Sequence, residues 1–423
     1  MINNNKAKYY DRRDHLLVFL LIANSGLPFF TNEPYILLGS MLINLLLLNW
    51  NELFKNKFLF KTLIFLLVLV IGQSIIIGIF DLRTTITLLF RWIYPFTVLF
   101  IVKEKFPRLF VNIMYFLTIV SLILFIPSML IPGFENFLQG LSTVFEQDSS
   151  NSFYSYNSNL LIYTIKPGSA MEGIMIFKRN SGPFWEAGGF GAYLILAILF
   201  SLLLDERILT RRNLIFFAAL LSTWSTAALI TLSALLFLYG TYGLKQRGYR
   251  LMLIPLIILG GYFAYSDLPF LKNRIDRSLV YFEQSRQIKY ERRDRMVSAI
   301  VDLRTFIKSP VFGTGRSSEA RFGNKGTSYL EHRNNGITDF LVKYGILFFV
   351  FYFWMMGKSI KYFAQFCGVR EFKKFAIIAM LCIFLIGFSQ VLFQQSVFIA
   401  IFWFSGIIKL NSGTYGNRSQ IAL

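Results

Sequence analysis

Long runs of apolar residues, separated by polar gaps, cover most of the sequence and restrict the folds it can adopt. An α-helix needs about 20 mainly apolar residues to cross the hydrocarbon core of a membrane. Hydropathy and polar breaks divide the sequence into about twelve runs of roughly this kind, some of them shorter. The runs are Leu16–Phe30, Tyr35–Asn49, Thr62–Phe80, Thr84–Val102, Leu109–Ile131, Ala187–Leu204, Asn213–Thr223, Ala227–Tyr242, Leu251–Tyr265, Gly336–Met356, Phe375–Gln390 and Val391–Ile408. We therefore predict an all-α, polytopic integral membrane protein.

The composition supports this prediction. Hydrophobic residues make up 55% of the 423-residue chain and aromatic residues 17%, which is more apolar surface than a soluble core of this length can bury. The first run, Leu16–Phe30, follows a basic segment as the core of a signal peptide does, but no small-residue cleavage pattern comes after it. We expect this run to remain as the first membrane span.

The charge of the gaps indicates the orientation of the chain. Lys and Arg gather in the N-terminal segment, in every second gap and in the tail after Lys409. Short cytoplasmic loops retain Lys and Arg, so these segments are predicted to share the cytoplasmic side. Both termini are then cytoplasmic, and the remaining connections lie on the outer side of the membrane.

Two outer connections are long, Pro132–Glu186 and Ser266–Asn335, and no Pro/Gly/Ser-rich linker or internal repeat divides the chain. We therefore treat residues 1–423 as one transmembrane domain with two long outer loops. The second loop carries about fourteen Lys and Arg against about eight Asp and Glu, on a side where the orientation rule gives no reason for positive charge. This excess indicates an anionic partner, and contact with membrane lipid headgroups is the alternative.

Three arginines of these outer loops are candidate ligands: Arg179, Arg295 and Arg316. A guanidinium group is always charged and binds two phosphate oxygens at once, so converging arginines can hold a pyrophosphate or a carboxylate without a metal ion. Isolated surface arginines are the alternative. Arg91 is a fourth candidate because it lies near the middle of a predicted span, where a charge is costly and usually functional. For Arg91 the alternative is a structural pairing with Asp81.

Two glycines and a carboxylate add further signals. Gly313 and Gly315, in "KSPVFGTGRSS", allow the backbone to approach a ligand closely and can present N–H groups as an anion-binding nest, with an ordinary loop as the alternative. Glu186 directly precedes the run that begins at Ala187, where a carboxylate either caps the helix or acts in the site.

His332 is one of two histidines in the chain and lies in the polar stretch "EHRNNGITD", directly before an apolar run. An imidazole titrates near neutral pH, and neighbouring cationic residues favour its neutral form. His332 is therefore a candidate general base for a hydroxyl group at the outer membrane edge. A surface histidine at a helix entry is the alternative.

Several other chemistries lack their usual motifs. The sequence contains no His-Glu-x-x-His, no Cys/His cluster with zinc spacing and no Asp-x-Asp, and its two cysteines are too few for a cysteine metal site. The stretch "MGKS" lacks the first glycine of a phosphate-binding P-loop. We therefore expect a metal-free reaction on a phosphorylated substrate carried by the membrane, with no cofactor and no nucleic acid partner.

Three polar segments follow one another along the chain: "RNSGPFWEAGGFG" before a span, "RMVSAIVDLRTFIKSPVFGTG" in the second outer loop, and "HRNNGITDFLVKYGI" at the start of another span. In this order and on this side of the membrane, they resemble the motifs of the O-antigen polymerase and O-antigen ligase superfamily. The register places Asn334 and Asn335 at the positions of a family His-Asn pair, and His332 lies two residues earlier. About twelve spans with two long periplasmic loops also resemble the family.

The resemblance implies a glycosyltransferase that acts at the periplasmic face of the bacterial inner (cytoplasmic) membrane. Its substrate is an oligosaccharide linked through pyrophosphate to undecaprenol, and the glycan is transferred with inversion. Membrane lipid, a chain-length regulator and a flippase are the further partners that it implies. For such a reaction we expect pyrophosphate binding by Arg91, Arg179, Arg295 and Arg316, general-base catalysis by His332 or Glu186, and acceptor positioning by Asn334 and Asn335.

Polymerase and ligase differ in the acceptor, which is another lipid-linked unit or the lipid A core. We favour a polymerase of O-antigen or capsule-type polysaccharide, because Glu186 follows "GPFW", where ligases are expected to carry other residues. A lipid-linked glycan exporter is a different class that would use a similar Arg-lined cavity. An exporter should show internal repeats or charged residues in several spans, and the sequence shows neither beyond Arg91.

Overall fold

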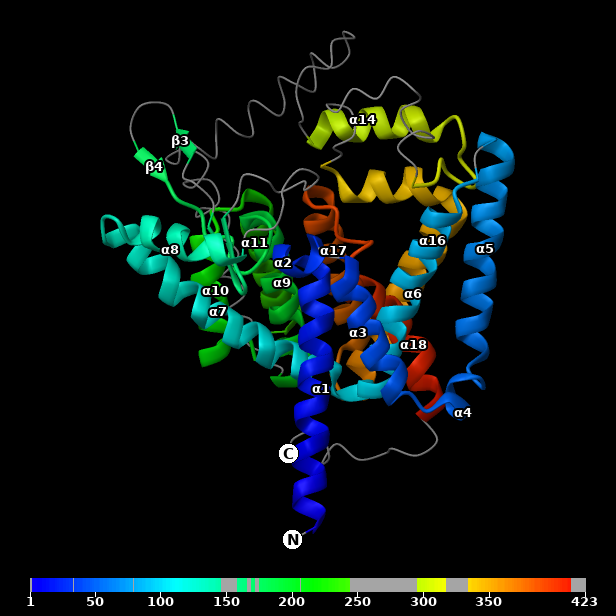
Figure 1. The fold of residues 1–423 in the computed structure, drawn as a ribbon, viewed down its shortest axis with the longest axis horizontal. Helices are drawn as coiled ribbons and strands as arrows, with labels where there is room; N and C mark the ends of the chain where they lie inside the picture. The colour runs from blue at the N-terminus through cyan, green and yellow to red at the C-terminus, as the bar shows by residue number, and fades with distance from the viewer. Residues whose placement is uncertain are drawn as a thin grey trace.

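The computed structural model describes residues 2–32, 34–78, 80–145, 158–165, 169–171, 175–205, 207–243, 295–316 and 334–411 (Figure 1). This part of the chain is mostly helical, as predicted. The helices are α1 (Ile2–Gly26), α2 (Pro28–Asn32), α3 (Pro34–Leu47), α4 (Trp50–Leu53), α5 (Lys57–Ile77), α6 (Leu82–Val102), η1 (Lys103–Lys105), α7 (Phe106–Leu130), α8 (Phe134–Ser142), η2 (Thr143–Phe145), α9 (Ala187–Asp205), α10 (Arg211–Ser222), α11 (Thr226–Gly243), α14 (Arg295–Phe306), α16 (Gly336–Phe366), α17 (Phe372–Ser389) and α18 (Ser396–Asn411).

Among the described residues, five helical stretches are long and apolar enough to cross a membrane, and three shorter apolar helices accompany them. The long stretches are Lys57–Ile77, Leu82–Leu130, Ala187–Asp205, Gly336–Phe366 and Phe372–Ser389, and the shorter ones are Tyr35–Leu47, Thr226–Gly240 and Ser396–Ile407. These helices confirm the coarser prediction of a helical protein embedded in a membrane. The predicted run Leu251–Tyr265 lies outside the described residues, so the number of twelve spans stays a prediction.

Aromatic side chains pack α6, α16 and α18 against one another inside the bundle. Trp92 of α6 contacts Phe348 and Tyr352 of α16 edge to face, with ring centroids 5.3 and 5.9 Å apart. It makes the same kind of contact with Phe402 and Trp403 of α18, at 5.2 and 6.1 Å. The Trp403 indole N–H also donates to the Trp92 carbonyl at 2.9 Å, which satisfies a buried polar group. This packing fixes α6 relative to α16.

A short turn joins α5 to α6. Gly78, in the left-handed region with φ 75°, ends α5 and donates its N–H to the Ser74 carbonyl at 2.9 Å. Asp81 then caps α6, because its carboxylate accepts a hydrogen bond from the Thr84 N–H at 3.1 Å. The turn therefore places the last turns of α5 beside the first turns of α6.

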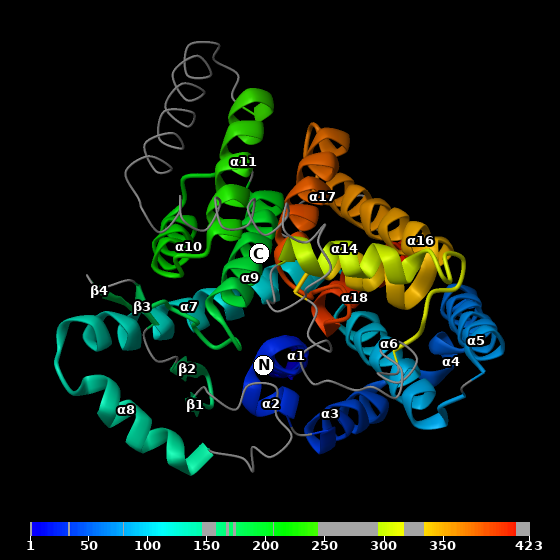
Figure 2. The same ribbon diagram turned by 90° about the horizontal axis from the view of Figure 1, so that it is seen from above.

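α14 lies across one end of the bundle, over the first half of α16 (Figures 1 and 2). The carboxylate of Asp302 in α14 is buried and accepts a hydrogen bond from the Thr338 hydroxyl of α16 at 2.8 Å. α1 begins and α18 ends at the opposite end of the bundle (Figure 1). α14, which belongs to the second long loop, therefore lies at one end of the bundle. The first turn of α1 and the last turn of α18 lie at the other end.

Part of the first long loop is folded rather than extended. α8 follows α7, and its Leu138 forms a small hydrophobic core with Tyr163 and Ile165 that is separate from the main core. Two short antiparallel hairpins complete this region, β1 (Ser158–Leu160) with β2 (Tyr163–Ile165) and β3 (Ser169–Met171) with β4 (Met175–Phe177).

α16 consists of two helical halves that meet at Gly345. The backbone angles of Gly345, φ 71° and ψ 173°, lie in a region that is essentially restricted to glycine. The first half lies beside α14, and the second half turns into the bundle (Figure 1). The sequence pattern predicted one span from Gly336 to Met356, and the structure divides this stretch into two halves at Gly345.

The loop after α14, residues 310–315, completes the hydrogen bonding at this break. The Thr314 N–H donates to the Val342 carbonyl at 2.8 Å, and the Gly315 N–H donates to the Lys343 carbonyl at 3.2 Å. In an unbroken helix these carbonyls would accept from N–H groups four residues further on. Backbone groups therefore hold the loop against α16.

Two glycines permit this close backbone contact. A Cβ at Gly345 would lie 2.1 Å from the Val311 carbonyl oxygen, and a Cβ at Gly313 would lie 2.5 Å from the Val342 carbonyl oxygen. Because the opposing atoms belong to the backbone, a change of side-chain rotamer cannot relieve either clash. The sequence at the break is therefore restricted by contact distance as well as by backbone angles.

We expect Gly345→Ala to lower the thermal unfolding midpoint of the purified protein clearly. Its backbone angles alone cost a residue other than glycine about 1–3 kcal/mol, and the clash adds to this. Gly357→Ala is the matched control in the same helix, because a Cβ there would meet only Met380, at 3.7 Å. Equal midpoints for the two variants would contradict the account of the break.

Candidate functional site

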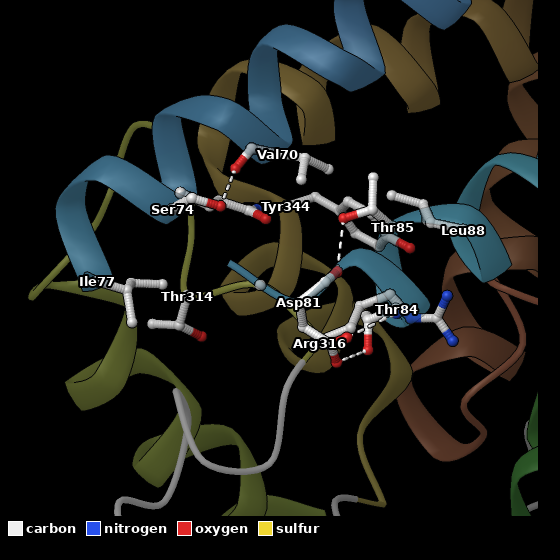
Figure 3. A pocket seen from close by; sticks show the side chains of 12 residues that line it. Val70, Ser74, Ile77, Asp81, Thr84, Thr85, Leu88, Thr314, Arg316 and Tyr344 are labelled. Atoms are coloured by element: carbon white, nitrogen blue, oxygen red, sulfur yellow. Dashed lines mark hydrogen bonds between the residues drawn. The ribbon is translucent and has the colours of Figure 1, made fainter. Parts of the chain in front are cut away.

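A polar pocket lies at the α14 end of the bundle, between α5, α6, the loop after α14 and α16 (Figure 3). Its open volume, including the solvent at its mouth, is about 500 Å³. The lining includes Gln73 and Ser74 of α5, Asp81 and Thr84 of α6, and Arg316 of the loop. Segments that are far apart in the sequence therefore contribute to one pocket.

Gln73 connects α5 to two other walls of this pocket. Its side-chain amide donates to the carbonyl oxygens of Phe312 at 2.7 Å and Lys343 at 2.8 Å. These bonds join α5, the loop and the break in α16 at one point. Gln73 was not predicted as a site residue, although a lone amide within an apolar run is a signal of hydrogen bonding between helices.

Arg316 of the loop and Arg91 of α6 lie close together beside Tyr344 of α16. Repulsion from Arg316 is the strongest electrostatic influence on Arg91, and both guanidinium groups act on the buried Tyr344 side chain. Both arginines were predicted as anion ligands, and the structure brings these two together. We refer to Arg91 and Arg316 as the arginine pair. Tyr344 was not predicted, and only the break directly after it brings it to the pocket.

Asp81 does not neutralise Arg91, which removes the structural alternative considered for this arginine. The Asp81 carboxylate instead caps α6, accepting hydrogen bonds from the Thr84 N–H at 3.1 Å and from the Thr84 hydroxyl. A helical rise of about 15 Å separates Asp81 from Arg91. Pairing with Asp81 therefore does not account for the charge at Arg91.

Asp339, a buried carboxylate of α16, acts on Tyr344 as the arginine pair does, but its hydrogen bonds go to other residues. Its Oδ2 accepts hydrogen bonds from Lys343 Nζ at 2.7 Å and from Gln394 Nε2 at 3.2 Å. Within the described part of the chain, the arginine pair forms no ion pair with a carboxylate. Neighbouring cations with little access to water and no counter-ion are costly. The pair is therefore suited to an anion with several charged oxygens, such as a pyrophosphate.

The prediction that Gly313 and Gly315 offer their N–H groups to an anion is wrong. The Gly313 N–H donates to the Ser309 carbonyl at 2.9 Å, and the Gly315 N–H donates to the Lys343 carbonyl at 3.2 Å. Both donors are used within the protein backbone. The glycines allow the loop to contact α16, and this contact places the next residue, Arg316, at the pocket.

Arg295 and Arg179 lie apart from the arginine pair. Arg295 begins α14, whose 12 residues span about 18 Å, whereas Arg316 follows the other end of this helix. The Arg179 Nε donates to the Thr223 carbonyl at 3.0 Å, directly after α10. The structure therefore does not gather all four predicted arginines into one clamp.

Glu186 and Gln390 lie together at the start of α9. A Cβ built on Gly188 would lie 2.3 Å from Gln390 Nε2 and 3.4 Å from Glu186 Oε1. The Gln390 carbonyl oxygen in turn would lie 2.0 Å from a Cβ on Gly336, the first residue of α16. Gln390 therefore lies close both to Glu186 and to the first turn of α16, where the predicted polar stretch ends.

Asn335 caps α16 and directly follows Asn334, which is partly buried. The Asn335 Oδ1 accepts hydrogen bonds from the backbone N–H groups of Ile337 and Thr338, both at 3.1 Å. Its Nδ2 is buried and has no hydrogen-bond partner among the described residues. A buried donor of this kind is costly when unpaired, which makes the Asn335 amide a candidate for a further hydrogen bond.

His332 lies outside the described residues, so its role stays a prediction from the sequence. In the described part of the chain, no group of three or more His, Cys, Asp or Glu side chains is placed to hold a metal ion. Comparisons of the sequence with models of known protein families and with curated proteins find no match. The function is therefore inferred from the arginine pair, the pocket and the three sequence motifs.

Asn335→Asp separates the two roles of this side chain. Aspartate caps a helix as well as asparagine does, but it lacks the Nδ2 donor. We expect Asn335→Asp to lose formation of the polysaccharide predicted from the sequence, with a lower thermal unfolding midpoint because its charge is buried. Asn335→Ala loses the cap and with it about 1 kcal/mol of stability. Full product formation by a folded Asn335→Asp protein would show that the donor has no part in the site.

Proposed function

We propose that the protein is a membrane glycosyltransferase that joins undecaprenyl-pyrophosphate-linked oligosaccharide units into an O-antigen or capsule-type polysaccharide. The observation that carries the proposal is the arginine pair: Arg316 lines the polar pocket, Arg91 lies next to Arg316, and neither has a carboxylate partner among the described residues. The order of the three sequence motifs adds to it. We assign the α14 end to the periplasm, because the basic gaps mark the opposite end as cytoplasmic.

The proposed reaction needs charge stabilisation, alignment of two substrates and a proton acceptor. The acceptor hydroxyl oxygen forms a bond to C1 of the donor sugar while the bond from C1 to the pyrophosphate oxygen breaks, and the configuration at C1 inverts. The arginine pair stabilises the charge that develops on the departing pyrophosphate. The hydroxyl proton passes to a base, for which His332 and Glu186 are the two candidates.

In the proposal, these candidates hold two glycans at different places along the first half of α16. The arginine pair holds the leaving group at one side of α16, beside α5 and α6. Glu186 and the free amide donor of Asn335 lie at the first turn of α16, where the second glycan is proposed to present its hydroxyl group. Holding both reactants in place lowers the entropic part of the barrier.

Lysine substitutions in the arginine pair test the proposal. Arg91→Lys and Arg316→Lys keep the charge but lose the two parallel N–H donors of a guanidinium group. We expect each to reduce polymer synthesis by about 10²-fold or more, nearly as much as alanine, since the loss falls on transition-state stabilisation. Polymer and accumulated lipid-linked single units are measured in cells that lack the native protein.

Arg83→Ala is the matched control, because Arg83 is exposed on the first turn of α6 and lies outside the pair. It should leave polymer synthesis intact. Full polymer synthesis by both lysine variants would show that the arginine pair does not bind the pyrophosphate. Accumulation of long lipid-linked polymer instead of single units would indicate a ligase.

His332→Ala and Glu186→Gln distinguish the two candidate bases. A general base contributes about 10²–10⁴-fold, so its loss should abolish most polymer while the protein stays folded and single units accumulate. We expect His332→Ala to have the larger effect, because an imidazole titrates near neutral pH. Normal polymer from His332→Ala with none from Glu186→Gln would assign the proton to the carboxylate.

A further inference from the structure

Two helices that line the pocket, α5 and α6, offer it hydrogen-bond acceptors (Figure 3). The Ser74 hydroxyl donates to the Val70 carbonyl at 2.9 Å, and the Thr85 hydroxyl donates to the Asp81 carbonyl at 2.8 Å. The Thr84 hydroxyl donates to the Asp81 carboxylate. Each hydroxyl group therefore donates its hydrogen to an acceptor of its own helix or of the residue that caps it. Only the lone pairs of its oxygen remain for a ligand.

Gln73 and Asp81 extend this surface. Gln73 gives its amide hydrogens to two backbone carbonyls, so the Oε1 atom, which would lie 3.2 Å from a Cβ on Gly315, is left as an acceptor. The hydrogen bonds from Thr84 lower the pKa of the exposed Asp81 carboxyl, which is therefore ionised at neutral pH. We call these residues, Gln73, Ser74, Asp81, Thr84 and Thr85, the acceptor wall.

Arg316 also lines this pocket and offers the opposite kind of hydrogen-bonding group (Figure 3). Its guanidinium group offers donors and positive charge, whereas the acceptor wall offers oxygen atoms and one negative charge. A ligand that satisfies both must carry anionic oxygens at one end and several hydrogen-bond donors at the other. A sugar 1-phosphate has this distribution, because the phosphate is joined to a ring that carries several hydroxyl groups.

We propose that the acceptor wall binds the sugar that is linked to the pyrophosphate, and that Asp81 selects this sugar by accepting hydrogen bonds from its hydroxyl groups. The inference rests on the proposed function, since the arginine pair then holds the pyrophosphate beside the wall. Acceptors on two different helices suit the divergent hydroxyl groups of a ring better than a single compact ammonium group. Asp81 is thus a specificity-determining residue of the site.

Binding of small anions to the purified full-length protein tests this inference without relying on activity. The probes are inorganic phosphate, glucose 1-phosphate, N-acetylglucosamine 1-phosphate and phosphoethanolamine, titrated calorimetrically into protein held in lipid nanodiscs. We expect at least one sugar phosphate to bind about 10-fold more tightly than inorganic phosphate, because hydrogen bonds to a charged group are strong. Phosphoethanolamine should show no comparable gain.

Asp81→Asn is the decisive variant, because asparagine still caps α6 but carries no charge and presents a donor. It should reduce the preference for sugar phosphate to about 3-fold or less. Its affinity for inorganic phosphate should be unchanged or higher, since a negative charge leaves the pocket. Asp81→Ser, another capping residue, replaces it should Asp81→Asn fail to fold. Glu52→Gln, which removes an exposed carboxylate in α4, should match the wild type.

The possible failures are distinguishable. Absence of binding by every probe to the wild-type protein would overturn the anion site, and with it both the proposed function and this inference. Equal binding of inorganic phosphate and both sugar phosphates, or a preference that Asp81→Asn leaves intact, would overturn the inference alone. Tighter binding of phosphoethanolamine than of either sugar phosphate would assign the acceptor wall to lipid headgroups and would also overturn it.

Discussion

The break in α16 at Gly345 is the feature on which the arrangement of the site depends. An unbroken helix would satisfy the carbonyls of Val342 and Lys343 within itself. Because Gly345 departs from helical geometry, these carbonyls instead accept hydrogen bonds from the loop after α14, and Lys343 also accepts one from Gln73 of α5. Three segments are thereby joined at carbonyl oxygens of the backbone, whose positions do not depend on side-chain rotamers.

This junction explains why two cations are held next to each other in spite of their repulsion. Arg316 follows directly after residues that bond to α16, so its backbone is well fixed. Arg91 precedes Trp92, whose ring packs against α16 and α18. The neighbouring acids Asp302 and Asp339 have partners within the protein and do not compensate the pair. Such preorganisation suits the binding of an anion, since no rearrangement has to precede it.

Much of the architecture follows from the sequence, because hydrophobic length and charge are local properties of the chain. The apolar runs predicted α6 and α9 to within two residues at each end. Arg91 was identified because a single charge within such a run is costly wherever the helix packs. The polar stretch before α16 was also recognised, and Asn335 indeed caps this helix.

Which polar residues meet was decided by the tertiary structure alone. The sequence order suggested that Arg295 and Arg316 act together, but α14 separates them and the loop brings Arg316 to Arg91 instead. The glycines of that loop looked like an anion-binding nest, yet their N–H groups bond to the protein itself. The two Gln73 hydrogen bonds that help set this geometry join residues 239 and 270 positions apart. Local patterns carry no information about such contacts, because these depend on where a helix breaks and on what packs against the break.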